Sequence, residues 1–99
     1  MDEQMHKLIE YSKKGILSKV VTKSEKLNIT LFCMAEGTDI SEHTSIKSGF
    51  VYVIEGNGVF NLKGKEIIMS PGVLIQMNEN AIHSLKATEN TSFILVLTN

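Results

Sequence analysis

A chain of 99 residues has the size of one compact domain, so we expect a single domain over residues 1–99. Hydrophobic residues make up 42% and charged residues 21%, which excludes a disordered chain and is typical of one that folds around a core. The formal net charge of −1 gives no general attraction to phosphate backbones or anionic lipid, so we expect no nucleic-acid partner and no membrane partner.

The first 27 residues permit two interpretations. Met5, Leu8 and Ile9 would share one face of a helix, whereas the β-branched cluster that follows Ile16 favours a strand. We prefer strands throughout this segment and leave a helix open for residues 1–15. No apolar run is long enough for a signal peptide or a membrane span, and the single cysteine, Cys33, excludes an intramolecular disulfide. Both features predict a cytoplasmic protein.

From residue 28 onward, short apolar runs alternate with turn residues. The runs expected to form strands are 28–34, 49–55, 59–62, 66–69, 73–77, 82–87 and 92–98. Glycines at 56 and 58 and the Pro-Gly pair at 71–72 supply tight reversals between them. Seven or eight short strands, with no helix of usable length after residue 28, predict an all-β fold built as an antiparallel sandwich or barrel.

Two histidines, His43 and His83, lie in this β-rich part of the chain. A barrel brings distant strands together and points alternate side chains into one interior, so the two imidazoles could meet. Neither histidine belongs to a compact metal-binding spacing. On the residues alone, a metal-ligand role and a packed, hydrogen-bonded role both remain open.

The spacing of Gly37, His43 and Gly56, followed by Gly72 and His83, resembles the two motifs of the cupin family of small barrels. The stretches EHTS and IHSLKA also resemble a subgroup of small single-domain cupins. The resemblance covers residue 27 to the C-terminus. It implies an antiparallel jelly-roll β-barrel whose core is residues 28–99.

The resemblance also implies an incomplete metal site. Cupins that hold a divalent metal usually supply two histidines and a glutamate from the first motif and one histidine from the second. Here the second histidine position is Ser45 and the glutamate position is Gly49, so two of four ligands remain. The resemblance implies at most one divalent transition metal ion, of unknown identity, held by His43 and His83.

Methionine sulfur could add a further ligand. Met77 is the candidate third ligand, and Met34 and Met77 together would suit a soft ion such as Cu(I). Methionine in a barrel is also ordinary gap-filling core, so both roles stay open.

The competing interpretation is a small-molecule pocket. The cupin register points the set that contains His43 inward, which gives an expected pocket of Ser45, Gly49, Val51, Val53, Met34, Met77 and Leu85. Such a mainly apolar pocket would suit a small hydrophobic or weakly acidic ligand.

We therefore expect a small-molecule-binding cupin with a metal ion as a further candidate. A metal-dependent enzyme, such as a small dioxygenase or isomerase, is the first alternative. A non-catalytic sensory or structural dimer with packed histidines is the second. Similar cupins commonly dimerise, often by adding the N-terminal strand to the neighbour's sheet, so we expect a homodimer that uses residues 1–27.

Overall fold

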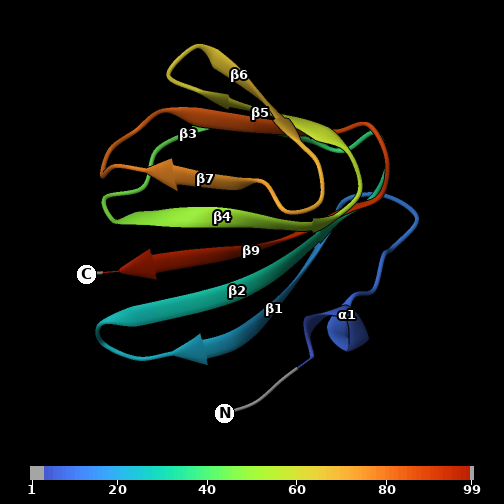
Figure 1. Ribbon diagram of the computed structural model, residues 1–99, viewed down its shortest axis with the longest axis horizontal. Coiled ribbons are helices and arrows are strands. Elements are labelled where there is room, and N and C mark those ends of the chain that lie inside the picture. Colours follow the sequence, from blue (N-terminus) through green and yellow to red (C-terminus); the bar gives the residue numbers. More distant parts are fainter. Residues whose placement is uncertain (1–3, 99) are drawn as a thin grey trace.

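Two antiparallel sheets face each other in the computed structural model, which describes residues 4–98 (Figure 1). The larger sheet contains, in spatial order, β1 (Ile16–Lys23), β2 (Leu27–Met34), β9 (Thr91–Thr98), β4 (Ser48–Glu55) and β7 (Leu74–Met77). The smaller sheet contains β3 (Asp39–His43), β8 (His83–Ala87), β5 (Gly58–Leu62) and β6 (Lys65–Met69). The predicted all-β, antiparallel jelly-roll fold is confirmed.

Strand alternation builds the interior between the two sheets. Along β4, Val51 and Val53 are buried at 1% and 0% exposure, while Phe50 and Tyr52 point outward at 37% and 42%. The core cluster of buried residues is Met34, Val51, Val53, Phe60, Met69, Ile75, Met77, Leu85, Ala87 and Phe93. Full burial of each large apolar side chain contributes about 1.5–3 kcal/mol, which makes this cluster the main source of stability.

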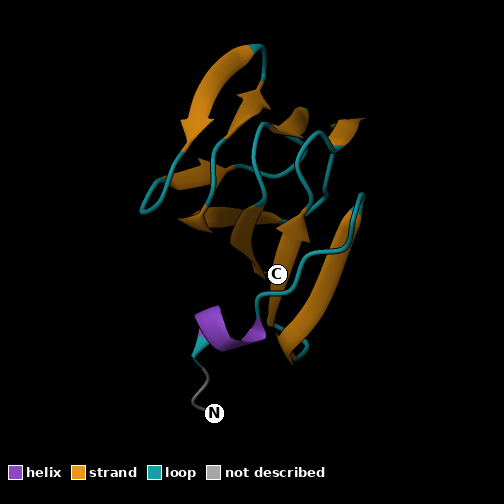
Figure 2. Ribbon diagram, turned by 90° about the vertical axis from the view of Figure 1, so that its right-hand side faces the viewer, coloured by secondary structure: helices purple, strands orange, loops and turns teal. Residues whose placement is uncertain are grey.

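The N-terminal segment differs from the preferred prediction. Residues 4–15 contain one helical turn, α1 (Met5–Leu8), so the preference for strands is wrong there, and residues 1–3 lie outside the described chain. The helical spacing of Met5, Leu8 and Ile9 was the correct signal. The helix lies outside the strands, at the end of the molecule opposite β6 (Figures 1 and 2).

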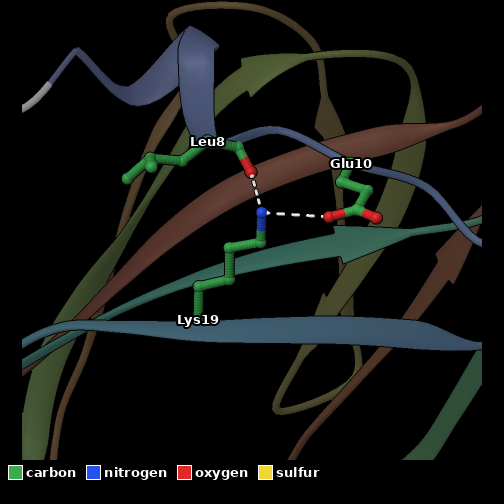
Figure 3. Close-up of polar contacts among 3 residues, drawn as sticks. All are labelled: Leu8, Glu10 and Lys19. Carbon is green, nitrogen blue, oxygen red and sulfur yellow. Dashed lines mark hydrogen bonds and ion pairs between the residues drawn. The ribbon is translucent and has the colours of Figure 1, made fainter.

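Lys19 ties this segment to the larger sheet. Its Nζ donates to the carbonyl oxygen of Leu8 at 2.7 Å and lies 3.2 Å from a carboxylate oxygen of Glu10 (Figure 3). The first of these contacts satisfies a carbonyl that the end of α1 leaves without a helical partner. Gly15, at φ +86°, then leads the chain into β1, which pairs with β2 of the same chain.

β3 was not among the runs expected to form strands. Its sequence, DISEH, carries little apolar alternation, so pattern alone gives no strand signal. It forms because it pairs with β8 at the edge of the smaller sheet. Within residues 4–98, no helix combines the length and the hydropathy needed to cross a bilayer.

Candidate functional site

β3 carries one extra residue opposite β8. Ile40 pairs with Leu85 and His43 pairs with His83, so three steps along β3 match two steps along β8. Strict alternation from Ile40 would point Glu42, and not His43, toward the interior. The bulge therefore brings His43 directly opposite His83, and Glu42 lies instead beside Ser41 in a groove of the smaller sheet.

The two imidazoles are in contact. Their ring centroids lie 4.0 Å apart, with an angle of 62° between the ring planes. His83 also stacks on Phe60, with centroids 5.6 Å apart and planes 3° from parallel. His83 is 7% exposed, whereas His43 is an exposed residue. One ring is thus held in the core, and the other reaches solvent.

Both rings are oriented by the main chain in the same way. Nδ1 of His43 lies 2.9 Å from the carbonyl oxygen of Ser41, and Nδ1 of His83 lies 3.0 Å from that of Ala81. A carbonyl oxygen can only accept a hydrogen bond, so each neutral imidazole carries its proton on Nδ1. Nε2 of each ring then keeps its lone pair for a ligand or a metal ion.

Burial lowers the pKa of His83 below its ordinary value of 6.5, because the charged ring is poorly solvated there. The hydrogen bond to the Ala81 carbonyl acts in the opposite direction, and the neighbouring His43 lowers the pKa further. His83 is therefore neutral at pH 7, which keeps its Nε2 an acceptor.

A cavity of about 220 Å³ opens between the sheets beside this pair. Its lining residues come from both sheets: Phe32, Ile40, His43, Val51, Phe60, Met77, His83, Leu85, Phe93 and Leu95. Eight of these ten side chains are apolar, and the other two are the histidines. His43 is thus both an exposed residue and part of the cavity wall.

The structure brings together part of the expected pocket. Val51, Met77 and Leu85 line the cavity with the two histidines, whereas Met34 and Val53 are buried in the core and are not among its lining residues. Sequence reasoning missed five lining residues: Phe32, Ile40, Phe60, Phe93 and Leu95. Alternation along β2 and β9 could have found Phe32 and Phe93, which pair across these strands and stack at 5.3 Å.

Ser45 and Gly49 are not among the residues that line the cavity. Ser45 lies in the loop between β3 and β4, where its hydroxyl accepts a hydrogen bond from the backbone of Lys47. Gly49 packs against β9 so closely that a Cβ built there would overlap the Val96 carbonyl oxygen. Position 49 therefore has no room for the glutamate that metal-binding cupins carry.

The donor set fits a complete metal centre poorly. Within residues 4–98, no group of three or more His, Cys, Asp or Glu side chains is arranged to hold a metal ion. Catalytic zinc sites, for comparison, usually have three protein ligands. Among the described residues, the donors on this cavity are His43, His83 and Met77.

Comparison with known proteins decides the family. Residues 30–98 match the model of the cupin domain. This chain belongs to the cupin family. No curated protein sequence matches this cupin significantly.

Solved structures share the fold at low sequence identity. A conserved Streptococcus pyogenes protein of unknown function is 21% identical with a TM-score of 0.89, and the match covers 100% of this chain and 87% of that one. A cupin superfamily protein from Desulfitobacterium hafniense is 21% identical with a TM-score of 0.87, covering 93% and 84%. A variant of salicylate 1,2-dioxygenase from Pseudoaminobacter salicylatoxidans is 15% identical with a TM-score of 0.80, covering 85% and 26%. At these identities the matches establish the fold alone.

The lowered pKa of His83 predicts a pH-dependent stability. Between its folded pKa and 6.5 the unfolded chain binds a proton that the folded chain does not, so the free energy of unfolding falls as pH drops through this window. Urea midpoints measured with chelator at about pH 7.5, 6.5 and 5.5 should show this fall. His83→Phe should flatten it, whereas the control His6→Phe on α1 should not. An equal pH dependence of the urea midpoint in the parent and both variants would contradict the assignment of this effect to His83.

The contact at Gly49 predicts a costly substitution. Gly49→Ala should lower the free energy of unfolding by more than about 2 kcal/mol, because the methyl group meets main chain that cannot move without breaking the β4–β9 pairing. Gly37→Ala is the matched control, since its site is open and only its φ of +84° opposes the change, at about 1 kcal/mol. Chemical denaturation measures both. A Gly49→Ala protein as stable as the parent would refute the close packing.

Proposed function

We propose that this cupin binds a small, mainly apolar organic molecule in the cavity between its sheets, with His43 and His83 as polar anchors. The observation that carries the proposal is an apolar cavity with two imidazoles in its wall, one of them exposed. Ligand sites of this kind combine apolar walls with a few convergent polar groups.

The size of the cavity limits the ligand. Its volume of about 220 Å³ is below the roughly 300–1,000 Å³ of pockets for drug-sized molecules. Among the described lining residues, no Lys, Arg, Asp or Glu side chain is present to pair with a strongly charged group. A ligand with one small ring or a short branched chain fits these limits.

Toluene, a neutral apolar probe, tests the cavity directly. Its saturable binding should shift the methyl NMR signals of Val51, Leu85 and Leu95, and toluene at ten times its Kd should stabilise the fold by about 1.4 kcal/mol. Leu95→Phe should abolish both effects by filling the cavity. Ile94→Phe, on the opposite face of β9, is the control and should bind as the parent does. Toluene shifts that lie away from the cavity, or that persist in Leu95→Phe, would refute the proposal.

A divalent transition metal ion is the second candidate ligand. It is favoured by the two unshared Nε2 lone pairs on rings that lie 4.0 Å apart. Met77 lies on the same cavity and is the candidate third donor, which would suit Cu(I) better than Zn²⁺. Dioxygenase or isomerase activity stays a prediction, and no catalytic step follows from so few donors.

Metal binding by two imidazoles should be weak and specific to the pair. Calorimetric titration of chelator-stripped, tag-free protein with Zn²⁺ and Co²⁺ should give one site, lost in His43→Ala and in His83→Ala. His6→Ala, which changes the histidine on α1, should leave the titration unchanged. Met77→Leu should weaken the binding of Cu(I) without affecting the binding of Zn²⁺. Titration heats that are absent, or that survive in both site variants, would exclude this candidate.

We also propose a homodimer. β1 is an eight-residue strand at the edge of the larger sheet, and its Val20 is 65% exposed. Long edge strands are prone to pair with a second chain, which would extend the larger sheet across the dimer. Light scattering should give twice the chain mass in solution, and a monomeric mass would contradict the proposal.

A further inference from the structure

The tautomers of the two histidines decide which polar group a ligand needs. Each Nδ1 proton is already donated, at 2.9 Å to the carbonyl of Ser41 and at 3.0 Å to the carbonyl of Ala81. Each neutral ring therefore offers its Nε2 as a hydrogen-bond acceptor and not as a donor. The matching group on a ligand is one with a proton to donate, such as a hydroxyl, and a carboxylate or an ether has none.

The walls of the cavity favour a flat ring. Phe60 lies parallel to His83, and Phe32 stacks on Phe93 with 20° between the ring planes. Aromatic rings pack well against such surfaces in stacked or edge-to-face arrangements. A closed apolar cavity of about 150 Å³ is known to hold benzene. The volume of about 220 Å³ found here suits one six-membered ring with a small substituent.

We infer that the ligand class is a single-ring phenol whose hydroxyl donates its one proton to Nε2 of one of the two imidazoles while its ring lies among the apolar walls. The inference rests on the proposed function. It adds two requirements for the ligand, a flat ring and a hydroxyl group. The neutral ligand displaces solvent from that Nε2 atom and replaces the lost hydrogen bond. A ring without the hydroxyl would leave a buried acceptor unpaired, which costs affinity.

Four probes of similar size separate the requirements: phenol, toluene, cyclohexanol and benzoate. Toluene lacks the hydroxyl, cyclohexanol lacks the flat ring, and benzoate has acceptors only. Affinities come from protein-observed NMR titrations of the full chain with chelator present. Phenol should bind tightest, with toluene weaker by about tenfold, as expected when one buried hydrogen bond is lost.

Two substitutions link the preference to the histidines. The double variant His43→Phe/His83→Phe should reduce the affinity for phenol to that for toluene in the same protein, because both acceptors are removed while both rings are kept, and the single variants show which of the two imidazoles the hydroxyl uses. His6→Phe is the control and should change neither affinity. His43 is exposed, so its variant can be tested even if the buried one fails to fold.

The outcomes separate the inference from the proposed function. If toluene, cyclohexanol or benzoate binds as tightly as phenol, the inference that the ligand is a phenol is wrong. The proposed binding of a small molecule in the cavity would still stand. A preference for phenol over toluene that persists in the double variant would overturn the role of the imidazoles. If none of the four probes binds, the proposed function itself fails.

Discussion

The site depends on one extra residue in β3. Without the bulge between Ile40 and His43, strand alternation would turn Glu42 inward, and a carboxylate would face the apolar interior. With the bulge, His43 lies opposite His83, and the carbonyl of Ser41, within the bulge, holds the His43 ring. A local irregularity of an edge strand thus sets the polar chemistry of a cavity that both sheets enclose.

The two positions at which the cupin motif would carry further metal ligands are occupied differently in this chain. Gly49 is pressed against the carbonyl of Val96, and Ser45 is engaged in its own loop. Restoring the two missing side chains would therefore not by itself rebuild a metal centre. What remains is a pair of acceptors in an apolar wall, an arrangement better suited to a neutral hydroxylated ligand than to a strongly held cation.

Most of the fold was accessible from the sequence, because short apolar and β-branched runs, such as those of β4 and β7, are separated by turn residues. Alternation placed Val51 and Val53 on one face of the strand, and the cupin resemblance gave that face as the inward one. β3 and its bulge were not accessible, since DISEH has no periodic pattern and its register is set by β8. Residues such as Phe60 join the cavity only through packing of one sheet on the other, which no local pattern encodes.

The central claim is that both imidazoles keep Nε2 free because the main chain holds Nδ1. Long-range ¹H–¹⁵N correlation spectra of the histidine rings, recorded on metal-free protein at about pH 7.5, report the tautomer of each ring directly. The account predicts a protonated Nδ1 and a bare Nε2 for both His43 and His83, with His6 as an internal reference. An Nε2-protonated tautomer at either residue would contradict it, and would make that ring a donor toward the cavity.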